Sequence, residues 1–254
     1  MKISGATAGA VMVMMMACLY APMVSAAMTS MAGDEIQIDG GKSYLNNNQW
    51  GAADVDEGWQ QVFYHSEHDM GWRWHWPSTT ESVKAYPALV TGWHWSSNYD
   101  PRSHLPAALS SLHHVRTHAR FALNADGRYN VAYDLWCHTS PRARWYSSPA
   151  AEVMVWLRSI NVHPAGDYKG RVTIDGRHWG FYVGSLPTGW PVYTFVLEEG
   201  TDDLSMDLQP LLGYLARTGH WRSDALFLSS VEFGSEIYSG SGELHLLDWQ
   251  LEID

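Results

Sequence analysis

The chain has 254 residues, long enough for one large β domain, and a formal net charge of -11. This charge argues against nucleic acids and anionic membrane surfaces as partners. Its 14 Trp and 13 Tyr far outnumber its 6 Phe. Aromatic rings that carry a polar atom suit surfaces that are apolar on one side and wet on the other. We therefore expect some of these rings to contact sugar rings, with a Trp-rich core as the alternative.

The N-terminal segment has the three parts of a secretory signal peptide. Lys2 precedes an apolar run over residues 10–21, and Val24-Ser25-Ala26 supplies the small residues of a cleavage site. The apolar run is too short to span a bilayer comfortably. We expect residues 1–26 to be removed and residues 27–254 to form a single secreted domain, extracellular or periplasmic, with no membrane contact after cleavage.

The chain has two cysteines. Because Cys18 lies in the expected signal peptide, Cys137 has no partner for an internal disulfide in the mature protein. A hydrophobic core must therefore stabilise the fold, and we expect Cys137 to be a small buried residue within it.

Most of the domain alternates apolar and polar residues as β-strands do. Three Trp share one face over 72–76, and apolar residues alternate with Arg and His over 115–121. Asp126-Gly127 and Asp175-Gly176 predict hairpin turns, since both residue types tolerate positive φ. Only residues 207–219 have leucines at helical spacing. Many short strands with one α-helix predict an all-β fold, an antiparallel β-jelly-roll sandwich forming one domain.

The expected strand over 151–157 places unusual residues on one face. Val153, Val155 and Leu157 form an ordinary core face, and Glu152, Met154 and Trp156 lie on the other. A carboxylate on a largely apolar strand is costly to desolvate unless it has partners or a chemical role. A surface Glu beside partly exposed hydrophobics is the alternative reading.

Two more strands place carboxylates opposite their core residues. Asp134 lies opposite the apolar face of 130–136, and Glu232 and Glu236 lie opposite Val231 and Phe233. If these strands are neighbours in one concave sheet, Glu152, Glu236 and Asp134 converge on a groove lined by Trp and Met. Two carboxylates in a groove are the minimum needed to cleave a glycosidic bond. Glu232 competes with Glu236 for the acid role and ranks lower because it is further from the turn.

The chain resembles glycoside hydrolase family 12 in motifs that occur in the family's order and cover nearly the whole mature chain. Glu-x-Met-x-Trp-Leu combined with the downstream Gly-Ser-Glu is the specific part of this resemblance. The matching segments are Asn47-Asn48-Gln49-Trp50-Gly51-Ala52, Val83-Lys84-Ala85-Tyr86-Pro87, Gly92-Trp93-His94-Trp95, Asn130-Val131-Ala132-Tyr133-Asp134-Leu135, Glu152-Val153-Met154-Val155-Trp156-Leu157, Val192-Tyr193-Thr194-Phe195-Val196 and Gly234-Ser235-Glu236.

The resemblance implies an endo-acting β-1,4-glucanase or xyloglucanase on a β-jelly roll with a concave substrate cleft. It implies that Glu152 is the nucleophile, Glu236 the general acid/base and Asp134 a helper that hydrogen-bonds the nucleophile. It also implies that Trp50 stacks on the sugar in the donor half of the cleft. Ile237-Tyr238 replaces the Pro-Phe of many members, so we expect the loop after the acid/base and the leaving-group subsites to differ.

Further contacts with substrate are expected, without a metal or cofactor. His113, His114 and His118 have a spacing that suggests metal binding on a helix, but the segment reads as a loop entering a strand, where such residues do not converge. We predict no metal site. The residues that we expect to contact substrate are Trp50, Asn48, Met154, His94, Trp95 and Trp156.

The leading hypothesis is a secreted, monomeric, retaining endo-β-1,4-glucanase (a cellulase) that acts on soluble or amorphous glucan. The alternative with the same chemistry is a xyloglucan-specific enzyme, whose groove must accept side-chain xylose. A sugar-binding sandwich without turnover is the alternative from another class, and the presence of both Glu152 and Glu236 argues against it.

Overall fold

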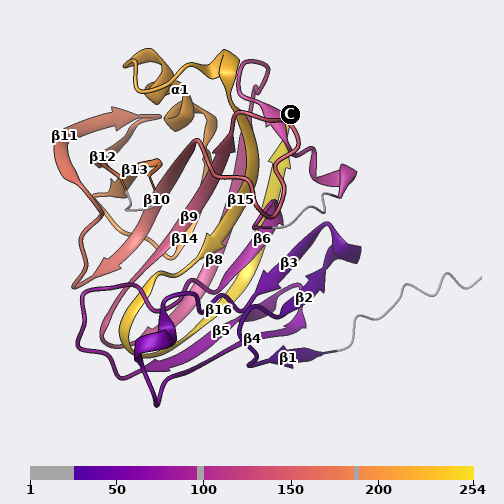
Figure 1. Cartoon of the computed structure of the whole chain (residues 1–254), viewed down its shortest axis with the longest axis vertical. Coiled ribbons are helices and arrows are strands. Elements are labelled where there is room, and N and C mark those ends of the chain that lie inside the picture. The colour runs from indigo at the N-terminus through magenta and orange to yellow at the C-terminus, as the bar shows by residue number, and fades with distance from the viewer. Residues whose placement is uncertain (1–25, 96–99, 186–188) are drawn as a thin grey trace, which may run out of the picture.

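The computed structural model describes residues 26–95, 100–185 and 189–254, so most of the expected signal peptide lies outside the described residues. In these ranges the chain forms two curved sheets and one α-helix (Figure 1). The outer sheet has the order β1 (Ala27–Thr29), β4 (Trp59–Ser66), β5 (Asp69–Trp76), β16 (Ile237–Ile253), β8 (Val115–Ala125) and β14 (Asp203–Asp207).

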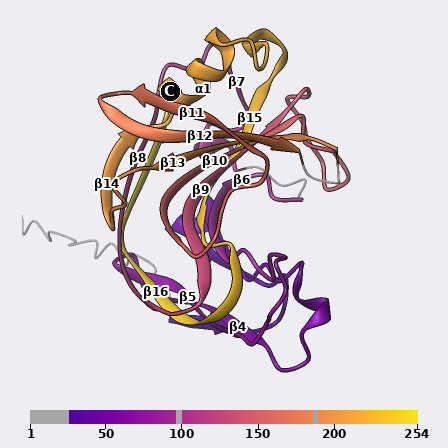
Figure 2. The same cartoon turned by 90° about the vertical axis from the view of Figure 1, so that its left-hand side faces the viewer.

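The inner sheet has nine strands in its main path. Their order is β2 (Glu35–Ile38), β3 (Ser43–Asn46), β6 (Ala88–Gly92), β15 (Phe227–Gly234), β9 (Arg128–His138), β10 (Ala151–Ile160), β13 (Pro191–Leu197), β12 (Arg177–Ser185) and β11 (Asp167–Ile174), and the short β7 (Ala107–Ala108) pairs with β15. The two sheets curve together toward one open side (Figure 2). The all-β jelly roll predicted from the sequence is confirmed.

One strand pair departs from the antiparallel rule. β10 and β13 run parallel, with Glu152 opposite Val192. The chain leaves β10, crosses to the edge of the sheet as β11 and returns through β12 and β13. Two reversals after β11 bring β13 beside β10 in the same direction.

The predicted alternation of faces is confirmed where it matters for the site. Val153, Val155 and Leu157 of β10 are buried in the main core between the sheets. Met154 and Trp156 belong to a separate cluster on the opposite face. The Trp residues of β5 also point into the main core, as does Cys137. The inner sheet therefore has one face in the core and one face free to form a site.

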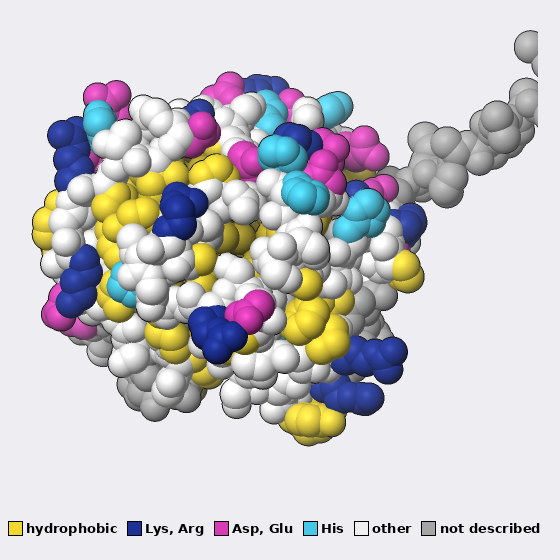
Figure 3. All heavy atoms as spheres, turned by 90° about the horizontal axis from the view of Figure 1, so that it is seen from above, with side chains coloured by type: hydrophobic (Ala, Val, Ile, Leu, Met, Phe, Trp, Pro, Cys, Tyr) yellow, Lys and Arg dark blue, Asp and Glu magenta, His cyan; other side chains and the backbone are white. Residues whose placement is uncertain are grey.

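The predicted helix is α1 (Gln209–Arg217), which buries Leu211, Leu212 and Leu215. Its start is fixed by Asp207, whose Oδ1 accepts a hydrogen bond from the backbone N–H of Gln209 at 3.0 Å. Seen from above, the face near this helix carries histidine side chains beside acidic ones, with hydrophobic side chains between charged groups (Figure 3).

One of the two predicted hairpins is wrong. Asp175 and Gly176 have φ of 52° and 71° and join the paired strands β11 and β12, as predicted. Asp126-Gly127 instead connects β8 in the outer sheet to β9 in the inner sheet, and these two strands do not pair. Both pair with β16, and the backbone N–H of Ser241 donates to Asp126 Oδ1 at 3.0 Å. The chain does turn at Asp126-Gly127, but β8 and β9 pair with β16 and not with each other.

β16 contributes to both sheets. Ile237 pairs with Tyr129 of β9 at the start of the strand, and residues 242–253 pair with β8 in the outer sheet. The strand begins directly after Glu236. The position of Glu236 is therefore fixed by a strand that links the sheets.

Candidate active site

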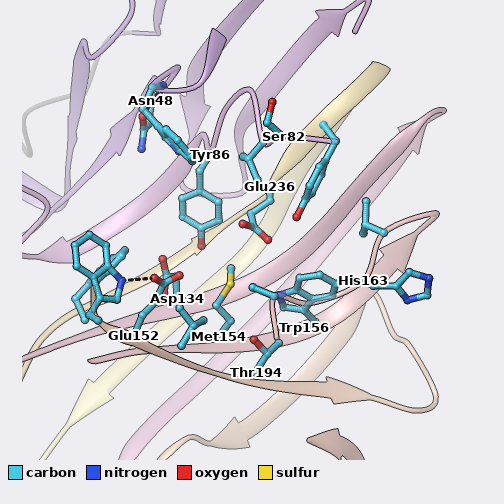
Figure 4. A pocket seen from close by; sticks show the side chains of 18 of the residues that line it. Asn48, Ser82, Tyr86, Asp134, Glu152, Met154, Trp156, His163, Thr194 and Glu236 are labelled. Carbon is cyan, nitrogen blue, oxygen red and sulfur yellow. Dashed lines mark hydrogen bonds between the residues drawn. The ribbon is translucent and has the colours of Figure 1, made fainter. Parts of the chain in front are cut away.

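The free face of the inner sheet carries a cleft of about 930 Å³ (Figure 4). The side chains of β9, β10 and β13 form its floor, and the segments before β6 and after β15 form one side. The predicted site residues that line it are Asn48, Trp50, His94, Trp95, Asp134, Glu152, Met154, Trp156 and Glu236. The structure therefore brings together every residue that the sequence placed in the site.

Strand register positions Asp134 and Glu152. Met154 of β10 lies directly opposite Asp134 of β9, so Glu152, one residue pair along, is a diagonal neighbour of Asp134 on the same face. Glu152 Oε2 accepts a hydrogen bond from Trp190 Nε1 at 2.9 Å. Asp134 and Glu152 are 4% and 6% exposed, so both carboxyl groups are buried at the cleft floor. Figure 4 shows Glu236 reaching toward this floor from the opposite side.

Asn130 holds Glu236 on both its side chain and its backbone. Asn130 Nδ2 donates to Glu236 Oε2 at 2.5 Å, and Asn130 Oδ1 accepts from the backbone N–H of Glu236 at 2.9 Å. The backbone N–H of Asn130 also donates to the carbonyl of Glu236 at 3.0 Å. The fully buried Asn130 therefore fixes the direction in which this carboxyl group enters the cleft.

The carboxyl groups share a low-dielectric site that favours their neutral forms. Burial raises the pKa of Glu236 to about 7, and the hydrogen bond from Asn130 offsets part of the rise. Burial raises the pKa of Glu152 to about 8, with a contribution from the charge of Glu236, and the hydrogen bond from Trp190 opposes this. Burial and the charge of Glu152 hold the pKa of Asp134 well above its usual range. The cluster therefore keeps protons at pH values where exposed carboxyl groups are ionised.

Glu232 shares the face of Asp134 but does not line the cleft. It is fully buried, pairs directly with Asp134 across β15 and β9, and accepts hydrogen bonds on Oε1. The partners are His94 Nδ1 at 3.0 Å and the Ser230 hydroxyl at 3.2 Å. Burial alone would lower the pKa of His94, but the charge and hydrogen bond of Glu232 outweigh it and raise that pKa. Glu232 is thus held by buried neighbours, whereas Glu236 lines the cleft.

Asn48 and Trp50 form one end of the cleft. Trp50 is 68% exposed, and its backbone N–H donates to Asn48 Oδ1 at 3.1 Å. Asn48 Nδ2 lies 3.3 Å from His94 Nε2. Gly51 must be glycine, because a Cβ there would lie 2.0 Å from the carbonyl oxygen of Val83. This close approach fixes the open indole of Trp50 against the segment before β6.

A buried lysine supports the same end. Lys84 is fully buried, and its Nζ donates to both carboxylate oxygens of Asp54 at 2.7 Å and to the Ser82 hydroxyl at 2.8 Å. The backbone carbonyl of Lys84 accepts from the N–H of Gly51 at 3.0 Å. Its backbone N–H donates to the carbonyl of Ile237 at 2.7 Å. Lys84 thus joins the Trp50 segment to the residue that follows Glu236.

Three residues of the site were not assigned a role from the sequence. Asn130 and Trp136 were placed on the correct face of β9, but their contacts with Glu236 and with the cleft depend on other strands. Trp190 precedes β13, where no periodicity gives its direction. Trp136 and Trp190 form an aromatic group with Trp95 and the buried Trp93. The ring centres of Trp95 and Trp136 lie 5.1 Å apart.

The residues directly after Glu236 point in different directions. Ile237 is fully buried in the core, while Tyr238 lines the cleft. The Arg128 guanidinium carbon lies 5.7 Å from the centre of the Tyr238 ring, and Arg128 pairs with Glu81. This segment therefore places the Tyr238 phenol at the cleft, next to the Arg128 cation.

Several polar atoms at the cleft floor have no hydrogen-bond partner among the described residues. They are Asp134 Oδ1, Trp136 Nε1, Trp156 Nε1 and Thr194 Oγ1. A buried polar group without a partner costs free energy. Two indole donors, a hydroxyl and a carboxyl oxygen are therefore buried and unpaired around one floor. Among the described residues, the cleft included, no group of three or more His, Cys, Asp or Glu is arranged to hold a metal ion.

Among known proteins, the chain is similar to endoglucanases and xyloglucanases. The chain is 43% identical to Endoglucanase S of Pectobacterium parmentieri over 235 residues, which cover 91% of this chain and 89% of that protein. It is 29% identical to a xyloglucan-specific endo-beta-1,4-glucanase A of Aspergillus niger over 237 residues, 89% of this chain and 88% of the other. Among solved structures, a native family 12 xyloglucanase from Bacillus licheniformis matches with a TM-score of 0.86 at 37% identity, covering 90% of this chain and all of that one.

A family model gives the same result. The model described as glycosyl hydrolase family 12 matches residues 41–254, which include every strand of the inner sheet except β2. The match covers both halves of the cleft and all the carboxyl groups described above. The chain therefore belongs to glycosyl hydrolase family 12 and is a glycoside hydrolase.

Proposed function

We propose that the enzyme is a retaining endo-β-1,4-glucanase that hydrolyses internal bonds of soluble or amorphous glucan. The observation that carries this proposal is that Glu152 and Glu236, from elements far apart in sequence, line one cleft with raised pKa values. A cleft along the face of a sheet suits a polymer bound across several strands. The unpaired polar atoms at its floor support a sugar as the occupant.

The roles follow from the chemistry of a double displacement. Glu152 attacks the anomeric carbon and forms a glycosyl ester while Glu236 gives its proton to the leaving oxygen. Glu236 then takes a proton from the water that cleaves the ester. Because repulsion between two carboxylates is mutual, loss of the Glu152 charge on esterification lowers the pKa of Glu236 at the step where it must act as a base.

The proton on Asp134 distinguishes the nucleophile from the acid. The pKa values of about 8 for Glu152 and about 7 for Glu236 would by themselves leave the proton on the nucleophile in the free enzyme. Asp134, whose pKa is held well above its usual range, would donate a hydrogen bond to Glu152 and favour its charged form. We expect Asp134 and Glu152 to titrate as one coupled pair. Trp190 assists from the other side by donating to Glu152.

The test compares three glutamine variants on two kinds of substrate. Glu152→Gln should abolish hydrolysis of both glucan and an aryl cellooligoside. Glu236→Gln should lower kcat on glucan about 100- to 10,000-fold, the range of general acid catalysis. The loss should be much smaller on an aryl glycoside whose leaving group needs no proton. Glu232→Gln is the matched control, and it should remain active. A Glu152→Gln protein with near-normal activity would contradict the assignment.

The stereochemistry of the product is a separate check. Proton NMR during hydrolysis should show the β-anomer as the first product, since two displacements restore the configuration. An α-anomer as the first product would indicate an inverting enzyme and end the nucleophile assignment.

Xyloglucan is the second candidate substrate. The solved xyloglucanase, all of which aligns with 90% of this chain, favours xyloglucan. Carboxymethyl cellulose, mixed-linkage glucan and xyloglucan should be compared side by side by release of reducing ends. Binding without new reducing ends on all three would contradict hydrolysis of β-glucan altogether.

We also propose that the protein is secreted and acts as a monomer. Support for export comes from the basic, apolar and small-residue segments over residues 1–26. Among the described residues no helix is long and apolar enough to cross a membrane. The mass of the exported protein should place its N-terminus next to Ala26, and sedimentation should give the mass of one chain.

A further inference from the structure

Two tyrosines continue the floor of the cleft toward the edge of the inner sheet. Met154 of β10 lies opposite Thr194 of β13, Thr194 lies opposite Tyr182 of β12, and Tyr182 lies opposite Tyr168 of β11. Residues directly opposite each other share one face of a sheet. The four residues therefore form a row that runs from the catalytic strand to the edge strand.

The two rings form a platform in which Tyr168 is exposed and Tyr182 is half-buried. Their centres are 5.2 Å apart at an interplanar angle of 56°, and Tyr168 is 57% exposed. Trp179 and Phe181 of β12 point into the main core, so Tyr182 faces the opposite way. A Cβ on Gly180 would lie 3.4 Å from the Tyr182 ring and 3.5 Å from the Tyr168 ring, so both rings extend over this glycine.

Polar side chains lie beside the platform. Arg171 of β11 lies opposite Gly180, and one of its guanidinium nitrogens is 2.7 Å from Glu198 Oε2. The Arg171 and Glu198 side chains are 55% and 36% exposed, so both can still meet a ligand. Flat rings for C–H faces next to hydrogen-bonding groups for hydroxyls are the combination that binds a neutral sugar.

We propose that the Tyr168–Tyr182 platform is an outer glucan-binding site, which holds the part of a polysaccharide chain that extends beyond the cleft. With strands about 4.8 Å apart, Tyr182 lies roughly 10 Å and Tyr168 roughly 14 Å from Met154 along the row. A polymer that continues past the cleft floor reaches this distance, while an aryl glycoside whose sugars occupy the Trp50 end of the cleft does not. The proposal rests on the proposed function, since continuity with the cleft floor selects a β-glucan as the occupant.

The test compares the kinetics of each variant on a polymeric substrate and on a short one. Tyr168→Ala, Tyr182→Ala and the double variant should keep kcat/KM on a short aryl cellooligoside within about two-fold. KM on soluble β-glucan or xyloglucan should rise about three- to ten-fold per ring, the size of an aromatic contact. In a Glu152→Gln background, electrophoresis in gels containing the polysaccharide should show the same loss of retardation.

Matched variants identify the cause. Tyr168→Phe and Tyr182→Phe keep the rings and should keep polymer binding. Trp59→Ala removes a ring that is 45% exposed on the outer sheet and should leave binding unchanged. Thermal unfolding of each variant confirms that it is folded.

Three outcomes overturn the proposal: wild-type polymer binding in the double variant, an equal loss on the short substrate, or a change in sedimentation that assigns the rings to contact between copies. Failure of the proposed function has a different signature. In that case the unmodified enzyme would release no reducing ends from any glucan, whatever residue stands at Tyr168 or Tyr182.

Discussion

Asn130 and Glu236 are joined by three hydrogen bonds, of which the shortest runs from the Asn130 amide to the Glu236 carboxylate at 2.5 Å. A donor to a carboxylate favours its charged form and lowers its pKa. Asn130 therefore limits how far burial can raise the pKa of Glu236, and it sets the pH above which the acid loses its proton.

Replacing Asn130 by Ala should move the basic limb of activity upward. Without the amide donor, the pKa of Glu236 rises above about 7, so the proton needed by the leaving group is kept to higher pH. The kcat should fall, because the backbone and side chain of Glu236 lose their support. A pH profile of kcat/KM measures both effects, and a basic limb that stays in place or moves to lower pH contradicts the role of Asn130.

Replacing Trp190 by Phe should act on the nucleophile. This variant removes the N–H that donates to Glu152 at 2.9 Å and keeps most of the ring. A hydrogen bond to a charged group contributes about 1.5–3 kcal/mol, so we expect kcat to fall roughly 10- to 100-fold. The acidic limb should move to higher pH, since the pKa of Glu152 rises. Trp95→Phe, in the same aromatic group, should leave that limb unchanged.

Replacing Glu232 by Gln should move the acidic limb to lower pH. Burial is the main cause of the raised pKa values of Glu152 and Asp134, and the charge of Glu232 adds to both. Removing this charge should lower both pKa values, because a like charge nearby disfavours the ionised form. The variant should remain active, unlike Glu236→Gln. An acidic limb that moves to higher pH would contradict this effect of the Glu232 charge.

The same residues show what sequence alone can predict. Alternation over 151–157 and 130–136 gives the correct face for Glu152 and Asp134, because that pattern is local. Whether two such strands are neighbours is not local, and the family motifs supplied this information. The pairing of His94 with Glu232 joins residues 138 positions apart, and no pattern in either segment indicates it. The Asp126-Gly127 turn failed as a hairpin for the same reason, since β16 from the end of the chain pairs with both strands.

Stability should decrease as pH rises from about 4.5 to about 8. The carboxyl groups at the site hold protons in the folded protein at pH values where the unfolded chain has lost them, so raising the pH favours unfolding. For Glu236, a rise from 4.5 to about 7 corresponds to about 3 kcal/mol. Glu236→Gln should therefore raise Tm at pH 8 and change it little at pH 4. Calorimetry of both proteins at the two pH values measures this, and an equal difference at both would refute it.

A strand that serves both sheets has a mechanical consequence. Because β16 starts directly after Glu236 and ends in the outer sheet, neither layer can detach while the other keeps its shape. We therefore expect substitutions that disrupt these 17 residues to disturb Glu236 as well. Heating should therefore give a single melting event, and catalysis should disappear together with the structure.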